Sequence, residues 1–221
     1  DRMRRPLPPL TTSGMQQDAA NKLNFSTRKT MMVAQQLYEG VEIKGMGTIG
    51  LVSYIRTDSV RISDEARAAA KKHITDKYGE SYYGGTVFSN KKKDVQDAHE
   101  AIRPSNVDIT PDDIKDHVTR DQYNLYRIIW QRFVASQMAP ARLKAVSASI
   151  NNGDYEFRAT GSKVLFDGFL KINPPAKNGE DEKWLPELVK GEELTPDEVR
   201  GIQNFTQPPA RFTEASLVKD L

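Results

Sequence analysis

Pro140 separates two parts of this 221-residue chain that carry different local patterns. Upstream of it, Ser or Thr repeatedly precedes an apolar periodic run that ends at Gly or Pro, as at helix boundaries. Downstream, apolar and polar residues alternate on both sides of residues 151–154 (NNGD), which predicts a β-hairpin. The chain is therefore expected to fold as α+β, with helices before Pro140 and strands after it.

The capping signals and periodicities predict individual elements. Helices are expected from Thr12 or Ser13 to about Leu23, from Ser26 to Glu39, from Asp64 to about Lys77, from Pro111, and from Thr119 to about Met138. Strands are expected at 49–55, 143–150 and 155–160, with further strands at 164–172 and 193–205. Helices that flank a short strand suggest a helix-turn-helix or winged-helix type of domain. In the second helix, Met31, Ala34, Leu37 and Tyr38 recur at helical spacing and are expected to face the core.

Composition excludes some classes of function. The chain has no cysteine, so disulfides, thiolate catalysis and cysteine-ligated zinc are excluded from these 221 residues. No run approaches the ~20 apolar residues that span a bilayer. The net charge of +2 is too small to indicate nucleic-acid binding by itself. Lys91 to Lys93 form the only basic run, which is interpreted as a loop, and residues 173–183 are interpreted as a polar loop.

Residues 50–59 (GLVSYIRTDS) carry the pattern with the clearest chemistry. If this segment is extended, Tyr54, Arg56 and Asp58 share one face, because strand side chains alternate. A phenol, with an ordinary pKa of about 10, needs a neighbouring cation to act as a nucleophile near neutral pH. A guanidinium stays charged and can hold two phosphate oxygens at once. The pattern suits attack on a phosphodiester, although spacing alone is explained more simply by an ordinary surface strand.

The amino-acid sequence of the segment favours the interpretation that it attacks a phosphodiester. Residues 54–59 (YIRTDS) resemble the active-site segment of type IA DNA topoisomerases, whose form is close to Tyr-Met-Arg-Thr-Asp-Ser. Ile55 is nearer to the Met of the bacterial topoisomerase I branch than to the Pro or His of other branches. Further stretches resemble the family in the same order along the chain, namely 11–17 (TTSGMQQ), 29–39 (KTMMVAQQLYE), 98–104 (AHEAIRP) and 208–219 (PPARFTEASLVK).

The resemblance implies roles for particular residues. Tyr54 would be the nucleophile that becomes joined to a DNA 5′ phosphate, Arg56 would stabilise the phosphate, and His99 would contact the phosphate or donate a proton. Candidate DNA-binding residues are Thr57, Asp58, Ser59 and Arg103. Fixing of the tyrosine loop explains the first three equally well, and a structural pairing explains Arg103.

The resemblance also implies a domain organisation. Residues 1–12 would end the first arch segment, 13–140 would form the tyrosine domain, 141–207 a β-rich arch, and 208–221 the truncated start of a returning segment. In this family, Mg²⁺ is held by an Asp-x-Asp-x-Glu cluster in a Toprim domain, and that pattern does not occur here. We therefore expect a fragment whose Mg²⁺ lies outside it and which binds no metal itself. Its missing partners are the Toprim domain and the rest of the returning segment of the same parent chain.

The expected function is relaxation of negatively supercoiled DNA by ATP-independent, transient single-strand cleavage, in the cytoplasm of a bacterium and in association with its nucleoid. The isolated fragment is expected to be inactive. One alternative is a winged-helix or β-arch module that only binds nucleic acid. Another is a tyrosine nuclease or recombinase, but those enzymes normally place more His or Arg residues near the nucleophile.

Overall fold

The computed structural model describes residues 1–89, 99–174 and 184–220. The helices are α1 (Thr12–Leu23), α2 (Thr27–Glu39), α3 (Asp64–Tyr78), α4 (Pro111–Ile114), α5 (Arg120–Gln137) and α6 (Glu214–Asp220), with 3-10 turns η1 (Glu80–Tyr82) and η2 (Gly168–Lys171). The strands are β1 (Arg2–Arg4), β2 (Val41–Ile43), β3 (Gly47–Ile49), β4 (Ala141–Asn152) and β5 (Tyr155–Phe166). The basic run 91–93 and most of the predicted polar loop lie outside the described residues.

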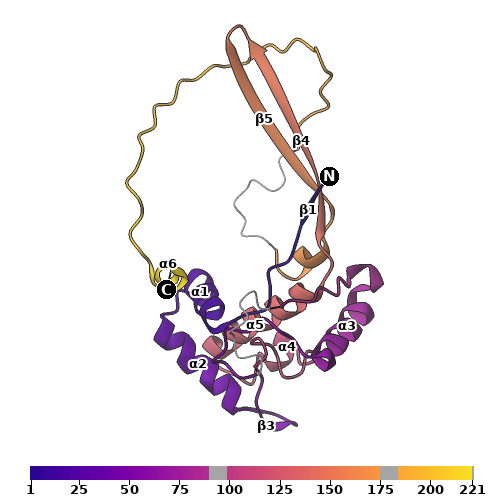
Figure 1. Cartoon of the computed structure of the whole chain (residues 1–221), viewed down its shortest axis with the longest axis vertical. Coiled ribbons are helices and arrows are strands. Elements are labelled where there is room, and N and C mark those ends of the chain that lie inside the picture. The colour runs from indigo at the N-terminus through magenta and orange to yellow at the C-terminus, as the bar shows by residue number, and fades with distance from the viewer. Residues whose placement is uncertain (90–98, 175–183, 221) are drawn as a thin grey trace.

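Helix α5 is the centre of the helical part, with α1, α2, α3 and α4 each in contact with it (Figure 1). The hydroxyl of its cap, Thr119, accepts a hydrogen bond from the Gln122 backbone N–H at 3.3 Å, and the Thr119 N–H donates to the Gln122 side-chain oxygen at 2.9 Å. Leu125, Ile129 and Phe133 of α5 are buried at helical spacing. The core of the molecule is therefore built around this one helix.

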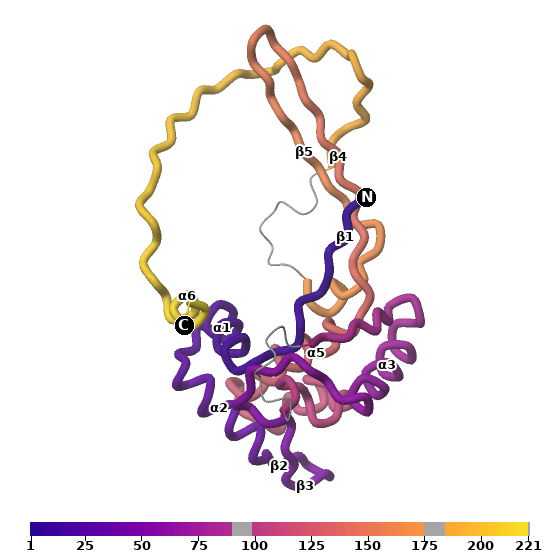
Figure 2. The backbone as a smooth tube through the Cα atoms, viewed as in Figure 1, coloured from indigo at the N-terminus to yellow at the C-terminus, as the bar shows by residue number. Residues whose placement is uncertain are grey.

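Beyond Pro140, β4 and β5 form a long antiparallel ribbon that projects away from the helices (Figure 1). The strands are joined through Gly153 and Asp154, and Gly153 has a φ of 58° at the loop position where a type II′ turn requires a positive value. Strand β1 pairs with the base of β4, so the N-terminus lies beside the ribbon (Figure 2). The predicted hairpin is confirmed and extends further at both ends than expected.

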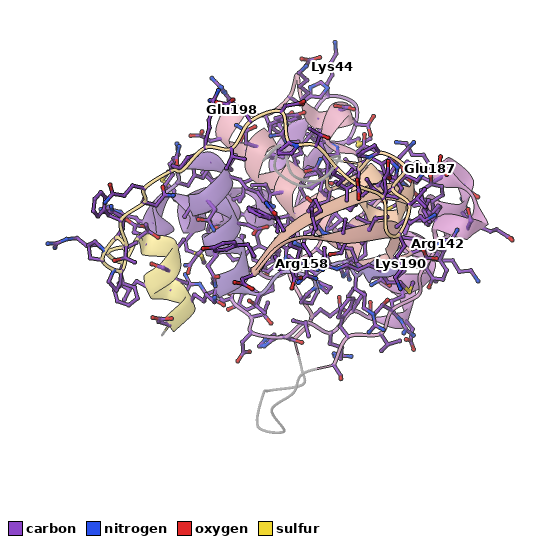
Figure 3. The ribbon with its side chains drawn as sticks, turned by 90° about the horizontal axis from the view of Figure 1, so that it is seen from above. Lys44, Arg142, Arg158, Glu187, Lys190 and Glu198 are labelled. Carbon is purple, nitrogen blue, oxygen red and sulfur yellow. The ribbon has the colours of Figure 1, made fainter. Side chains whose placement is uncertain are left out.

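Residues 184–213 contain no helix or strand and run back from the ribbon to α6, which contacts α1 (Figure 1). Seen from above, Arg142 and Arg158 lie on the ribbon, whereas Glu187 and Glu198 belong to this returning segment (Figure 3). The predicted strand at 193–205 is therefore wrong. The expectation for 164–172 is only partly correct, because the end of β5 is followed by η2.

The α+β class is confirmed, and most predicted helix boundaries hold. Ser26, Ser63 and Thr119 are N-caps as expected, whereas α1 is capped by Thr11 instead of Thr12 or Ser13. The predicted strand at 49–55 is wrong: β3 ends at Ile49, and Val52 makes only an isolated bridge to Pro104. Residues 41–49 form a small hairpin of β2 and β3 before it.

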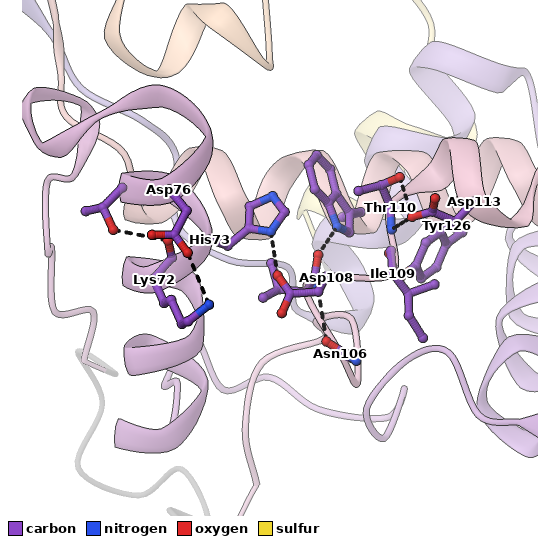
Figure 4. Close-up of polar contacts among 12 residues, drawn as sticks. Lys72, His73, Asp76, Asn106, Asp108, Ile109, Thr110, Asp113 and Tyr126 are labelled. Carbon is purple, nitrogen blue, oxygen red and sulfur yellow. Dashed lines mark hydrogen bonds and ion pairs between the residues drawn. The ribbon is translucent and has the colours of Figure 1, made fainter. Parts of the chain in front are cut away.

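Helix α3 is joined to the segment before α4 by a buried histidine (Figure 4). His73 contacts Asp108 through Nδ1 at 2.8 Å, and its ring lies edge-on to Trp130 of α5. The Trp130 indole donates to the Val107 carbonyl at 2.8 Å. These contacts hold residues 106–110 against α3 and α5, just downstream of the segment that begins at His99.

Candidate active site

The segment that carries Tyr54 is held by three neighbours that are distant in sequence. The Leu51 N–H donates to the Leu37 carbonyl at the end of α2, and the Ser53 N–H donates to the Arg103 carbonyl. The Thr57 N–H donates to the Thr12 hydroxyl at 2.8 Å. A loop tied at three points to different elements has a defined backbone path without belonging to a sheet.

Gly50 allows this segment to lie close against α2. A Cβ at this position would be 2.6 Å from the Tyr38 carbonyl oxygen, which is backbone and cannot move aside. Any other residue would therefore push the Tyr54 segment away from the end of α2.

Exposure alternates along the segment, as the sequence predicted, although bends at 53, 55 and 56 replace a regular strand. Ile55, Thr57 and Ser59 are buried. Tyr54, Arg56 and Asp58 are exposed, with Tyr54 at 41%. The hydroxyl-bearing ring that resembles the family nucleophile is thus accessible and is not part of the core.

Two other rings contact Tyr54. The His99 ring lies with its centroid 5.4 Å away and its plane tilted by 33°. The Tyr38 ring lies 5.7 Å away in an edge-to-face arrangement at 69°. The structure therefore brings together the two residues that the sequence assigned to the reacting group, and adds Tyr38, which the sequence assigned to the core.

The segment after His99 is joined to the tyrosine segment by hydrogen bonds. The Ser53 hydroxyl donates to the Ala101 carbonyl at 2.9 Å and accepts from the Arg103 N–H at 3.0 Å. The Ser105 N–H donates to the Leu51 carbonyl at 2.9 Å. Ser53 was not singled out from the sequence, because its role depends on a partner 48 residues away.

Arg56 provides an exposed cation in the same loop as Tyr54. Within the part of the chain that the structure describes, its guanidinium makes no ion pair or side-chain hydrogen bond. It is therefore accessible to an external anion, and its contact with a phosphate stays a prediction.

Arg103 is differently placed. Its Nε donates to Glu100 at 2.7 Å and its Nη1 to the Pro104 carbonyl at 3.1 Å, and the side chain is mostly buried. Burial tends to raise the pKa of the Glu100 carboxyl, but hydrogen bonds from Ser63 and Arg103 outweigh it and lower that pKa. The structural pairing considered for Arg103 is therefore present.

The same side chain also lines a pocket of about 300 Å³ with Glu65 and Asn106, so DNA contact stays a prediction.

Thr57 and Ser59 act within the loop itself. The Ser59 N–H donates to the Thr57 hydroxyl at 3.0 Å, and the Arg61 N–H donates to the Ser59 hydroxyl at 3.1 Å. Both side chains are buried, so their hydroxyls stabilise the turn after Tyr54. Asp58 is exposed. Contacts of these three residues with DNA stay predictions.

Within residues 1–89, 99–174 and 184–220, no three His, Asp or Glu side chains gather in a way that could hold a metal ion. No helix in the described ranges is long and apolar enough to cross a membrane. The chemical groups available here are an exposed phenol in contact with an imidazole, and an exposed guanidinium two residues further along the same loop.

Comparison with known proteins identifies the family of this chain. The family model described as DNA topoisomerase matches residues 1–221. Full-length topoisomerase I from Thermotoga maritima is similar in structure, with a TM-score of 0.83 and 39% sequence identity. The match covers 99% of this chain and 35% of that protein, so the chain spans about a third of its relative. The chain belongs to the type IA DNA topoisomerase family.

Proposed function

We propose that this chain is the tyrosine-bearing part of an enzyme that relaxes negatively supercoiled DNA by cutting and rejoining one strand. The observation that carries the proposal is the accessible Tyr54 ring in contact with His99, in a loop that also exposes Arg56. A buried phenol remote from both groups would have been incompatible with attack on a polynucleotide.

In the proposed reaction, the Tyr54 oxygen loses its proton and forms a bond to a phosphorus of single-stranded DNA. The bond from that phosphorus to the 3′ oxygen breaks, and the 3′ oxygen leaves with a proton as a hydroxyl. Arg56 balances the charge that develops on the phosphate oxygens, and His99 contacts the phosphate or supplies the proton. Rejoining is the reverse exchange, which needs no ATP because one phosphodiester replaces another.

Strand passage is proposed to use the β-rich part of the molecule. Cleavage leaves the 5′ phosphate on Tyr54, so separation of the tyrosine domain (13–140) from the rest of the enzyme would open the broken strand. The arch (141–207) would guide this movement, and another strand would pass before closure. Because single strands are held through backbone charge and base stacking, binding should weaken as salt is raised.

Magnesium is proposed to be held outside this chain by a Toprim domain, since the described residues lack a suitable donor cluster. Because the proposed reaction needs that domain, the chain alone is proposed to be inactive. We place the complete enzyme in the bacterial cytoplasm with the nucleoid. Incubation of the isolated chain with negatively supercoiled plasmid and Mg²⁺ should give no relaxation, and robust relaxation would contradict this division of labour.

The nucleophile is tested in the full-length enzyme by Tyr54→Phe. This variant should form no covalent adduct with a single-stranded oligonucleotide labelled on the 3′ side of the cleavage site, while binding persists. Tyr155→Phe, the same change on an exposed tyrosine of the ribbon, is the matched control and should cleave normally. Adduct formation by Tyr54→Phe would show that Tyr54 is not the nucleophile. Binding without any adduct in the wild-type enzyme would instead favour a non-catalytic nucleic-acid-binding module.

A further inference from the structure

Tyr38 occupies an unusual place for a residue of an apolar helical stripe. Leu37 beside it is fully buried, but Tyr38 is 40% exposed at the last turn of α2. Its ring contact is with Tyr54, edge-to-face at 5.7 Å. Exposure and contact with Tyr54 distinguish Tyr38 from the buried residues of the same helical stripe.

The backbone around Tyr38 fixes this contact. The Leu37 carbonyl accepts from the Leu51 N–H at 2.8 Å, and Gly50 allows the two chains to approach at the Tyr38 carbonyl. Helix α2 is anchored at its other end by the Ser26 cap and along its length by buried Val33 and Leu37. Tyr38 therefore projects from a rigid element at a fixed distance from the start of the Tyr54 segment.

The Tyr54 ring is contacted by rings from other parts of the chain. Its neighbour Ile55 is buried, whereas the Tyr54 ring is exposed and contacts the rings of Tyr38 and His99. An exposed side chain samples several χ1 rotamers, and only some of them aim the phenol oxygen at one point. An edge-to-face ring pair favours one of these orientations.

We propose that Tyr38 is a positioning residue. Its edge-to-face contact with the Tyr54 ring holds that ring in the orientation from which the phenol oxygen attacks. This inference rests on the proposed role of Tyr54 as nucleophile. It does not require Tyr38 to touch DNA. Removal of the ring should therefore slow formation of the covalent bond while leaving DNA affinity unchanged.

The test uses the full-length enzyme and a single-stranded oligonucleotide under single-turnover conditions. Tyr38→Leu should lower the maximal cleavage rate by about two- to tenfold, the range that loss of one aromatic pair produces. The dissociation constant for the oligonucleotide and the pH dependence of cleavage should keep their wild-type values. Tyr38→Phe, which keeps the ring and loses only the hydroxyl, should cleave at the wild-type rate.

Tyr155→Leu is the matched control, because it makes the same change at another exposed tyrosine, and its rate should be unaffected. A wild-type rate in Tyr38→Leu would overturn the inference, as would a slow Tyr38→Phe. Weaker oligonucleotide binding with an unchanged rate would show that Tyr38 is a DNA contact. If Tyr38→Leu is too unstable to assay, Tyr38→Gln, which suits an exposed helical position, carries the same expectations.

The two proposals fail separately. If Tyr54→Phe still forms an adduct, the nucleophile has been misassigned and the positioning role fails with it. If Tyr54→Phe forms no adduct and Tyr38→Leu cleaves at the wild-type rate, the nucleophile stands and only the role of Tyr38 is wrong.

Discussion

Thr12 connects the start of α1 to the loop on both sides of Arg56. Its hydroxyl donates to the Ile55 carbonyl at 2.7 Å, with the Thr57 carbonyl 3.1 Å away, and accepts from the Thr57 N–H at 2.8 Å. Its own backbone N–H donates to the Thr57 carbonyl at 2.8 Å. One side chain thus satisfies backbone groups that would be paired by a neighbouring strand in a sheet.

Replacement of Thr12 by Val keeps the shape of the side chain and removes this hydroxyl. The Thr57 N–H then loses its acceptor in a partly buried site, which should lower the free energy of unfolding by about 1–2 kcal/mol. Urea unfolding of the chain measures this difference, and amide hydrogen exchange at Thr57 should become faster. Thr12→Ser keeps the hydroxyl and should retain most of the stability. A loss of stability in Thr12→Ser with none in Thr12→Val would show that packing of the methyl group is what matters.

The Glu100 carboxyl, which pairs with Arg103 near the candidate site, makes the free energy of unfolding depend on pH. Although burial raises the pKa of Glu100, hydrogen bonds from Ser63 and Arg103 bring it below its ordinary value of 4.5. A carboxyl with a lowered folded-state pKa stabilises the fold above its unfolded pKa, and this contribution is lost as the pH falls through the folded value.

Glu100→Gln should therefore lower the free energy of unfolding by about 1–2 kcal/mol at pH 7. The difference from the wild type should shrink as the pH falls below 4.5. Urea unfolding at several pH values measures both effects. Glu42→Gln, at an exposed position of β2, is the control and should stay within about 0.5 kcal/mol. A Glu100→Gln deficit that persists at low pH would show that its cause is not the charge.

Helix ends were predictable from the sequence because a cap is a local interaction. Ser26 and Ser63 each accept a hydrogen bond from the backbone N–H three residues ahead, so the residues involved are neighbours in sequence. The path of the Tyr54 segment was not predictable in the same way. Its backbone partners at Leu37, Arg103 and Thr12 come from three separate stretches, and its apolar run was therefore mistaken for a strand.

The residues of the candidate site also divide into those that the sequence predicts and one that depends on a distant contact. Tyr54, Arg56 and His99 were predicted because they lie in sequence motifs that resemble those of a known family. Tyr38 was not predicted, because its spacing in α2 is that of a core residue. Only the approach of the Tyr54 segment to the end of α2 reveals that its ring has another partner.

Helix α6 is joined to the helical part by a side chain that caps a different helix. The Glu214 carboxylate accepts from the Thr27 N–H at the start of α2 at 2.8 Å, and Ala215 is buried where α6 meets α1. A carboxylate at a helix N-terminus pairs an otherwise unsatisfied donor and interacts favourably with the helix dipole. This contact links a segment of 7 residues to the rest of the fold.

Glu214→Ala should loosen α6, because a helix this short depends on its tertiary contacts. Amide hydrogen exchange at 217–220 and at Thr27 should become several-fold faster, while the amides of α5 keep their protection. Lys219→Ala, an exposed change on the same helix, is the control and should leave exchange at Thr27 unchanged. Unchanged exchange in Glu214→Ala would show that burial of Ala215 suffices to hold α6.

The whole molecule combines a helical part that contains the core with a ribbon that contributes little to it. Buried apolar residues are concentrated in α1, α2, α3 and α5 and in the loops between them. No residue from 147 to 160 is buried, so the outer ribbon has no layer covering either face. Burial of apolar surface is the main stabilising contribution to a fold, which implies that helical stability is independent of the outer ribbon.

Shortening of the ribbon tests this independence. Replacement of residues 148–159 by Asn-Gly would join Ser147 to Thr160, which are paired across the ribbon, through a two-residue turn. Thermal unfolding followed by the helical circular dichroism signal should change by less than about 4 °C, the shift expected for 1 kcal/mol in a chain of this size. A matched substitution inside the core, Leu125→Ala in α5, removes a fully buried side chain and should lower the midpoint by about 4–10 °C. If the shortened ribbon destabilised the chain as much as Leu125→Ala does, the ribbon and the helices would have to unfold as one cooperative unit. A midpoint close to that of the wild type would instead show that the helical part, which includes the Tyr54 loop, is stable without the outer ribbon.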